Sequence, residues 1–168
     1  MLFGGERAFV SVATFLALVP GVTGDFFRKA YYFLTLDRFA TSAGVGFGSY
    51  FSHRQAQMGA KSSCGSYCVL GCCAIGEGVL MGSHVLILSG KGQHVYDEAG
   101  RLADGTYAQI TIGEHTWVGS GAIIMASVGQ GCIIGAGAVV TKKVENNCLV
   151  AGNPARVIRK LDTPPTDQ

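Results

Sequence analysis

The sequence has few charged residues and few long apolar runs, and each shortage argues against a class of function. Only 14% of the 168 residues are charged and the net charge is +2, which is too small to indicate nucleic-acid binding. The apolar stretch near the N-terminus, "AFVSVATFLALV", holds 12 residues and is too short to cross a bilayer. The chain contains no G-x-x-x-x-G-K-[ST] loop, so nothing in it supports ATP binding.

The C-x-x-C spacing of cysteines is also missing. The chain holds six cysteines, but none of them forms the C-x-x-C pair that is common in zinc sites. A chain of this length with 48% apolar residues can bury a core without disulfides. We therefore predict that the cysteines are small, buried free thiols, which fits a reducing compartment, and we expect no metal cofactor.

What the chain does contain is a period of six residues. Glycine often follows the key residue of each repeat, and the position four residues after it is often small or branched. The key residues form two series, Val45, Phe51, Gln57, Ser63, Val69, Ile75, Met81, Ile87 and, after an interruption, Ile112, Val118, Ile124, Val128, Ile134, Val140. A helix would repeat near 3.6 residues and a half-buried strand near 2. A period of six instead predicts short strands joined by tight corners and stacked into a parallel β-helix.

One step of the second series is irregular. Val128 follows Ile124 by only four residues, within "IMASVGQGC". We therefore predict a pinched corner near residues 126–128, after which the register recovers.

The repeats "IGEGVLMGSHVLI" and "ITIGEHTWVGSGAII", followed by "GCIIGAGAVVTKKV" and "VAGNPARVIRKL", resemble those of the hexapeptide-repeat acyltransferases. The resemblance runs from about Val45 to Leu161 and is strongest to the sugar and polysaccharide O-acetyltransferases. It implies an all-β solenoid, a left-handed parallel β-helix with an N-terminal helical segment and one extruded loop. It also implies an enzyme that uses acetyl-CoA and works as a homotrimer on a sugar or glycan-precursor acceptor.

The interruption, "SGKGQHVYDEAGRLADGTYAQ", breaks the period between the two series. We expect residues 91–109 to leave the stack at a corner as a solvated loop, and such loops often carry function. The resembling enzymes have their catalytic histidine at this point, which corresponds to His94. Histidine can accept the proton of a sugar hydroxyl as that hydroxyl attacks a thioester. Asp97, Glu98 or a backbone carbonyl would orient the ring, and Tyr67 and Asp97 are further candidates for acceptor contact.

The resemblance also places coenzyme A between neighbouring subunits, along the corners of the C-terminal coils. Small residues there would let the pantetheine arm approach the backbone, and arginines would pair with the nucleotide phosphates. The residues that match the family's donor contacts are Trp117, Ser120, Ala136, Thr141, Lys142, Arg156 and Arg159. The other histidines, His53, His84 and His115, read as surface or trimer-interface residues.

The two ends of the chain do not repeat. We assign residues 1–42 to an N-terminal apolar helical segment, residues 43–161 to the β-helix domain and residues 162–168 to a tail. The helical segment either caps the β-helix or lies on the inner membrane face through residues 8–39, where Arg7, Arg28, Lys29 and Arg38 would meet anionic headgroups. A signal peptide is a further reading, but a cytoplasmic enzyme is expected because the donor is cytosolic.

Two other functions remain open from the sequence. The same scaffold suits an N-acetyltransferase for an amino sugar, or a non-catalytic β-helix in a membrane-associated assembly. A zinc enzyme like the γ-class carbonic anhydrases would need three converging histidines, and their spacing here does not offer the close pair such sites use. The acceptor itself is not named by any motif.

Overall fold

The computed structural model describes residues 5–89, 94–97, 100–104 and 107–162. These residues form two helices, α1 (Gly5–Ala17) and α2 (Gly21–Thr35), followed by short strands in three parallel sheets. Sheet A consists of β1 (Arg38–Phe39), β4 (Gln57–Met58), β7 (Cys73–Ile75) and β12 (Ile110–Ile112). Sheet B consists of β2 (Gly44–Val45), β5 (Ser63–Cys64), β8 (Leu80–Met81), β13 (Trp117–Val118), β15 (Ile133–Ile134), β17 (Cys148–Gly152) and β18 (Ala155–Lys160). Sheet C consists of β3 (Tyr50–Phe51), β6 (Val69–Leu70), β9 (Leu86–Ile87), β14 (Ile123–Ile124) and β16 (Val139–Val140).

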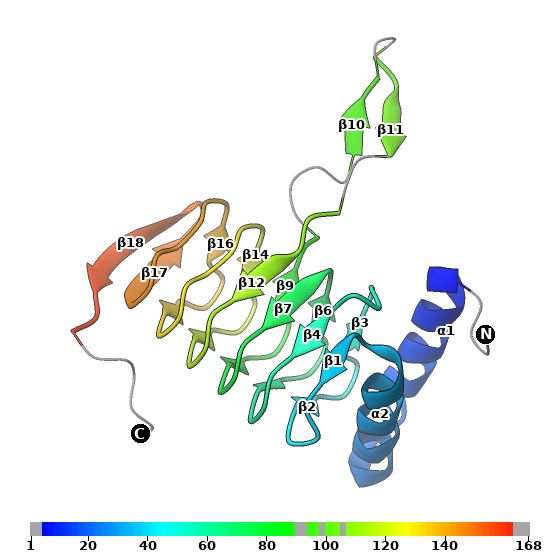
Figure 1. Cartoon of the computed structure of the whole chain (residues 1–168). Coiled ribbons are helices and arrows are strands. Elements are labelled where there is room, and N and C mark those ends of the chain that lie inside the picture. Colours follow the sequence, from blue (N-terminus) through cyan, green and yellow to red (C-terminus); the bar gives the residue numbers. More distant parts are fainter. Residues whose placement is uncertain (1–4, 90–93, 98–99, 105–106, 163–168) are drawn as a thin grey trace.

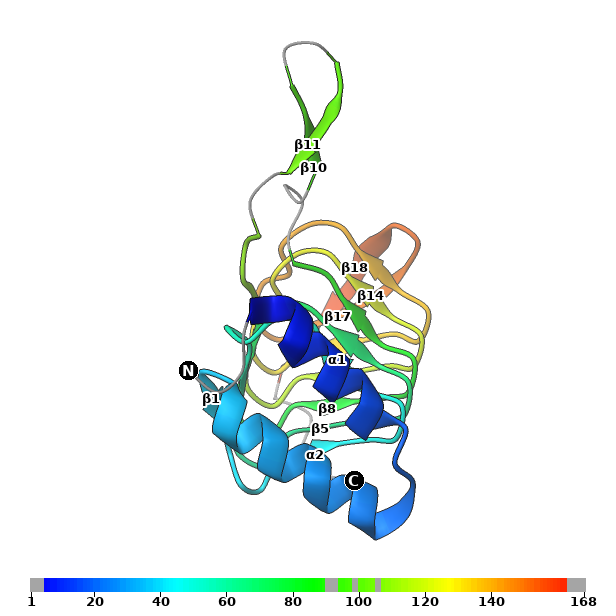
Figure 2. The ribbon, with the colours of Figure 1, turned by 90° about the vertical axis from the view of Figure 1, so that its right-hand side faces the viewer.

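The chain visits the three sheets in turn, so each coil adds one strand or bridge to each sheet (Figure 1). This is the parallel β-helix that the six-residue period predicted, left-handed as the resemblance implied, and the predicted fold class is confirmed. Only β18 departs from the parallel arrangement within the three sheets, because it folds back antiparallel on β17. Figure 2 looks onto the end of the stack that the two helices cover.

Three columns of inward side chains fill the solenoid. The sheet A column is Phe39, Met58, Ile75, Ile112, Val128, Val144; the sheet B column is Val45, Cys64, Met81, Val118, Ile134, Val150; the sheet C column is Phe51, Leu70, Ile87, Ile124, Val140. All these side chains are buried, and all six cysteines are buried free thiols, as predicted.

The predicted series was wrong by one position in the second coil. Gln57, Ser63 and Val69 precede the inward residues Met58, Cys64 and Leu70 rather than pointing inward themselves. The step from Phe51 to Met58 spans seven residues because the corner after β3 holds one residue more than a hexapeptide. From β7 the predicted series and the structure agree.

The short step near residues 126–128 affects sheet A alone. Val128 joins Ile112 and Val144 through isolated bridges in place of two-residue strands, yet it is buried like the other inward residues. In the next sheet Val118 pairs with Ile134, so the register recovers as predicted.

The two helices close one end of the stack. Phe9 of α1 and Tyr32 of α2 are buried in the same apolar core as Phe39 and Phe51. The Tyr32 hydroxyl also accepts the backbone N–H of Phe51 at 3.3 Å. Because these side chains pack into the first coil, the two helices contribute to the hydrophobic core of the β-helix.

Arg28 joins the helices to the solenoid. Its guanidinium is buried and donates to the carbonyls of Leu16 at 3.2 Å, Val19 at 2.8 Å and Val45 at 2.9 Å, and it pairs with Asp25. It thus satisfies carbonyls that the end of α1 leaves without helical partners. The prediction that Arg28 meets lipid headgroups is therefore wrong, because four backbone carbonyls, with that of Ala17 at 3.5 Å, and a carboxylate already pair with it.

An insertion leaves the stack between β9 and β12. Its described part includes a hairpin of β10 (His94–Tyr96) and β11 (Leu102–Asp104), with His94 opposite Asp104. The hairpin projects well beyond the coils in both views (Figures 1 and 2). Its neck is closed by a hydrogen bond of 3.0 Å from the Ala108 N–H to the Ser89 carbonyl.

Candidate active site

The three sheets meet at three long edges, which differ in chemistry. The C–A edge is made of the corners between sheets C and A: residues 52–56, 71–72, 88–89 with 107–109 at the foot of the insertion, 125–127 and 141–143. The B–C edge is made of residues 46–49, 65–68, 82–85, 119–122 and 135–138, and the A–B edge of residues 59–62, 76–79, 113–116, 129–132 and 145–147. These edges are the positions where side chains can leave the stack without breaking a ladder.

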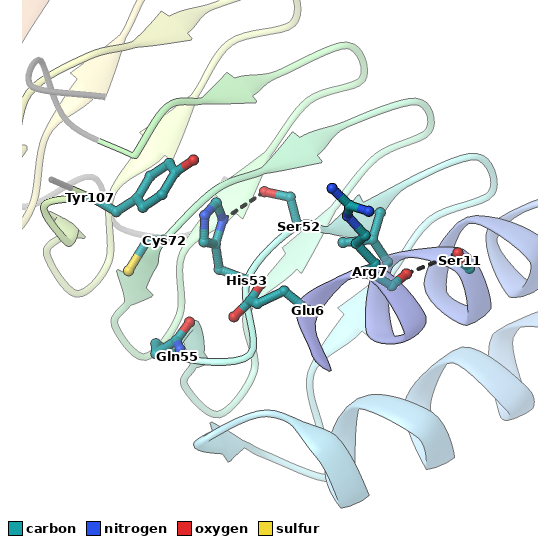
Figure 3. Close-up of a pocket in the computed structure, with 9 residues that line it drawn as sticks. Glu6, Arg7, Ser11, Ser52, His53, Gln55, Cys72 and Tyr107 are labelled. Carbon is teal, nitrogen blue, oxygen red and sulfur yellow. Dashed lines mark hydrogen bonds between the residues drawn. The ribbon is translucent and has the colours of Figure 1, made fainter. Parts of the chain in front are cut away.

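A pocket of about 1020 Å³ opens on the C–A edge (Figure 3). Helix α1 forms one wall with Glu6, Arg7 and Ser11, and the first coils form the other with residues that include His53 and Cys72. Tyr107, at the end of the insertion, completes it. The volume is at the upper end of the range for small-molecule sites.

His53 is the histidine in this wall. It follows Phe51 and Ser52 at the end of β3, so the corner turns its ring outward beside the first turns of α1. Its Nδ1 lies 2.9 Å from the Ser52 Oγ and 3.4 Å from the Ser89 Oγ. The Tyr107 ring packs against it, with the ring centroids 4.7 Å apart. The ring is therefore held at one nitrogen and on one face.

Ser89, in the third corner of this edge, connects His53 in the first corner with Cys72 in the second. It is buried, and its Oγ accepts the Cys72 backbone N–H at 2.8 Å. Ser49, Ser62 and Thr116 make the same kind of bond between coils at other corners. Among these four hydroxyls, Ser89 differs in also contacting a histidine, at the point where the insertion begins.

Cys72 is a poor nucleophile in this pocket. Burial, together with the negative charges of Glu6 and Asp37, raises the pKa of its thiol. At neutral pH it therefore stays protonated, and the thiolate is the reactive form of cysteine.

The structure places the predicted base, His94, at the first residue of β10. Its backbone pairs with Asp104 at the end of the hairpin nearer the coils. The insertion that carries it is anchored at the pocket: Tyr107 packs on His53, and the Gln109 side-chain amide donates to the Gln55 carbonyl at 3.2 Å. The pocket and the predicted base thus belong to the same edge of the solenoid.

The predicted donor residues fall into two groups. Trp117, on sheet B, is half exposed, and Ser120 and Ala136 are exposed in successive corners of the B–C edge. Arg156 and Arg159 are exposed on β18, at the end of the same sheet B. Thr141 and Lys142 lie instead on the C–A edge, on the coil after the pinched corner. One chain therefore does not bring all seven residues to a single groove.

The B–C edge is smooth near Ser120 and Ala136. A Cβ on Gly119 would lie 2.5 Å from the Ala136 backbone nitrogen, and one on Gly82 would lie 2.3 Å from the Ser120 Oγ. These corners stack backbone on backbone, and only glycine allows so close an approach. The resulting surface lets a thin chain lie against the main chain, which fits a pantetheine arm.

The candidates for acceptor contact lie elsewhere. Tyr67 is on the B–C edge, half exposed, and stacks on His84 with ring centroids 5.4 Å apart, so it does not line the pocket of its own chain. The Asp97 carboxylate accepts from the Arg101 Nε at 3.0 Å and the Arg101 N–H at 2.9 Å within the hairpin. Glu98 and residues 163–168 lie outside the described residues.

Sequence reasoning missed the pocket and the place of His53 in it. His53 was read as a surface or interface residue, as His84 and His115 were. Its wall partners come from residues 6–11, 52–55, 72 and 107, and no local pattern links these segments. The sequence did contain one indication of this site. Ser52 and His53 directly follow the inward residue Phe51, at the same edge from which the insertion later leaves the stack. Within the described part of the chain, no group of three or more metal-ligating side chains is present.

Comparison with known proteins agrees with this architecture. A family model described as the hexapeptide repeat of succinyl-transferase matches residues 109–142. The chain carries the hexapeptide repeat. A search of curated proteins by sequence gave no match, whereas many solved structures are similar.

Three of these structures show the shared fold. A maltose O-acetyltransferase from Clostridium difficile 630 is 24% identical, with a TM-score of 0.82 over 94% of this chain and 87% of that one. A galactoside acetyltransferase in complex with coenzyme A is 22% identical, with a TM-score of 0.72 over 94% and 81% of the two chains. A hexapeptide-repeat acetyltransferase from Vibrio cholerae O1 biovar eltor, in complex with acetyl coenzyme A, is 19% identical, with a TM-score of 0.73 over 94% and 88%. The predicted resemblance to this family is thus confirmed for the repeat and the fold.

Proposed function

We propose that the protein is an acetyl-CoA-dependent O-acetyltransferase that modifies a hydroxyl of a sugar or polysaccharide precursor. The observation that carries the proposal is the pocket on the C–A edge, at the foot of the insertion that bears His94. The hexapeptide repeat and the fold shared with a maltose O-acetyltransferase support it. Carboxylate, guanidinium, hydroxyl and imidazole groups around the pocket suit a ligand rich in hydroxyls.

His94 acts as the general base in this mechanism. It takes the proton of the acceptor hydroxyl as the oxygen attacks the thioester carbonyl carbon. The C–S bond then breaks, coenzyme A leaves as the thiolate, and His94 returns the proton to it. Acetyl passes directly from sulfur to oxygen, so the chain needs no nucleophile of its own.

The donor residues are those predicted on sheet B and its edge. Acetyl-CoA supplies the activated acetyl group when bound, and the smooth corners at Ser120 and Ala136 accept its pantetheine arm. A backbone N–H of this edge stabilises the developing oxyanion. Trp117 flanks the acetyl end, and Arg156 and Arg159 pair with the phosphates.

The active unit is a homotrimer in this proposal. Donor residues lie on the B–C edge, while the pocket, the insertion, Thr141 and Lys142 lie on the C–A edge. One groove can hold both sets only if unlike edges of two copies meet. Such head-to-tail contacts close into a ring, and a ring of three gives three equivalent grooves.

The outer face of the two helices is a second candidate contact, with a membrane surface. This face consists of exposed apolar side chains, Phe15, Leu18, Val22, Phe26, Phe33 and Leu34. No helix in the described part of the chain is long and apolar enough to span a bilayer. An enzyme in the cytoplasm could lay this face on the inner membrane, where lipid-linked sugars are assembled.

The charges refine how that contact is tested. Exposed Arg7 and Arg38 each directly follow an acidic residue, Glu6 and Asp37, which leaves Lys29 as the remaining exposed cation of the three. We therefore expect binding to depend on apolar area and little on salt. The full-length protein should sediment with phosphatidylcholine vesicles at low and high salt, and the double variant Phe26→Ser, Phe33→Ser should stay in the supernatant. Failure of the unaltered protein to sediment would refute the membrane contact without touching the acetyltransferase.

The proposed activity is tested by measuring free thiol released from acetyl-CoA with a panel of maltose, galactosides, amino sugars and nucleotide sugars. All six cysteines are buried, so a thiol reagent should report coenzyme A with little background. The acetylated product should lose its acetyl group in mild base, because an ester is labile and an amide is not. A base-stable product would favour the amino-sugar N-acetyltransferase, and no turnover with any acceptor would favour the non-catalytic scaffold.

A further inference from the structure

The ring of His53 is fixed, but one of its nitrogens is left for a ligand. Ser52 and Ser89 hold Nδ1, and Tyr107 covers one face. Nε2 lies on the side of the ring away from Ser52 (Figure 3). None of the residues placed by the structure makes a hydrogen bond to it. A polar ring atom of a pocket-lining residue that has no partner among the described residues is suited to bind a ligand.

We propose that His53 binds the acceptor, donating a hydrogen bond from Nε2 to an oxygen of the sugar beside the hydroxyl that His94 deprotonates. This inference rests on the proposed function and deepens it. His94 would move the proton, and His53 would hold the acceptor in place. Neither the predicted donor residues nor the predicted catalytic residue includes His53.

Donation from Nε2 requires Nδ1 to be the acceptor nitrogen of the neutral ring. The Ser89 Oγ accepts the Cys72 N–H at 2.8 Å, and its own hydrogen can be donated to another atom. Nδ1 of His53 lies 3.4 Å from this oxygen. The Ser52 hydroxyl, at 2.9 Å, is the nearer donor for the single lone pair of Nδ1, and it also lies 3.4 Å from the Leu70 carbonyl. With Nδ1 as acceptor, the neutral ring carries its hydrogen on Nε2 and presents a donor to the pocket.

The wall opposite His53 offers complementary groups. Glu6 of α1 lines the pocket with a carboxylate that can accept from sugar hydroxyls, and Arg7 offers donors. A donor on one side and an acceptor on the other fix the orientation of a polyhydroxylated ring. At about 1020 Å³ the pocket also exceeds the needs of one sugar ring, so we expect acceptors with a further group attached to be preferred.

Two hydrogen bonds connect this binding site to the insertion. The Ser89 residue that contacts His53 also closes the neck of the insertion through its carbonyl and the Ala108 N–H. Tyr107, next to Ala108, packs on the His53 ring. An acceptor held by Nε2 therefore lies at the foot of the segment that carries His94, which is where a base would need it.

The kinetic test compares three full-length variants on the best acceptor of the panel. His53→Phe should raise the KM for the acceptor about tenfold, as expected for one lost hydrogen bond, with the KM for acetyl-CoA unchanged. His53→Gln, which can place an amide N–H near the position of Nε2, should recover most of that loss. His115→Asn, at an exposed corner of the A–B edge where asparagine tolerates the left-handed backbone, is the matched control. An unchanged acceptor KM in His53→Phe, or no recovery in His53→Gln, would overturn the proposal.

A measurement that does not depend on turnover separates this proposal from the proposed function. Nitrogen-15 chemical shifts of the His53 imidazole in the unaltered protein, assigned by comparison with His53→Gln, should show hydrogen on Nε2 and none on Nδ1. The Nε2 signal should shift when the sugars of the panel are added. If the protein transfers no acetyl group but the sugars still shift Nε2, the proposed function fails and acceptor binding by His53 stands. Hydrogen on Nδ1, or no shift with any sugar, contradicts the role of His53.

Discussion

The C–A and B–C edges of the solenoid are built from the same repeat but have opposite surfaces. The C–A edge carries His53, the pocket and the insertion, so its outline is interrupted and polar. The C-terminal part of the B–C edge carries small residues over glycine corners, where coils stack closely at Gly82 and Gly119. One edge can enclose a polar ligand, and the other can support a thin one.

The difference between the two edges arises because the corners of a repeat can vary while its inward positions cannot. The inward columns need the same residue types in every coil, because each coil must match its neighbours. The corners face solvent and are free to differ. An acyl transfer between two ligands needs both kinds of surface, and this chain offers them on different edges. Substitutions can disable each edge separately.

The largest effect is expected from removing the base on the C–A edge. His94→Ala should lower kcat for acetyl transfer by 10² to 10⁴, the usual contribution of a general base. Binding of acetyl-CoA, measured by calorimetry, should be unchanged because the B–C edge is intact. A loss of less than about tenfold in kcat would show that His94 is not the base.

A large effect on stability is expected from Arg28, which ties α1 to the first coil. Arg28→Ala should lower the free energy of unfolding by about 3 kcal/mol, because it leaves buried carbonyls and Asp25 without their partner. Its neighbour Lys29 is exposed, and Lys29→Ala should stay within about 0.5 kcal/mol of the original protein. Denaturant unfolding measures both, and equal effects would contradict the assigned role.

That prediction could not be made from the sequence, which placed Arg28 on the membrane-facing side. The repeat was readable because each inward position is set by its neighbours above and below. The series failed at Gln57, Ser63 and Val69, where one extra corner residue moved the inward position. The roles of Arg28 and His53 could not be predicted because their partners are distant in sequence. A charged side chain such as Arg28 can be buried only where folding brings several carbonyls around it.

A middle-sized effect is expected from filling the smooth corner of the B–C edge. Ala136→Phe should raise the KM for acetyl-CoA about tenfold or more, since the new ring occupies the surface proposed for the pantetheine arm. Gln130→Phe is the matched control, because it sits between two glycines in the same corner position on the A–B edge. Steady-state kinetics should show no change in the control, and a similar change in both variants would refute the donor site.

The smallest effect is expected in the helical wall of the pocket. Glu6→Gln keeps the shape but removes the charge, so the KM for the acceptor should rise only about threefold, the value of one weakened hydrogen bond. The KM for acetyl-CoA should be unaltered. The same rise for both substrates would show that α1 supports the fold and not the acceptor.

The most direct test of acetyl transfer between unlike edges of two copies combines the two altered edges in one oligomer. Copies with His94→Ala keep an intact B–C edge, and copies with Ala136→Phe keep an intact C–A edge. In mixed trimers about a quarter of the grooves should pair the two intact edges. At low acetyl-CoA, mixed trimers should regain activity well above that of either variant alone. Activity no greater than the average of the two separate variants would contradict transfer between unlike edges.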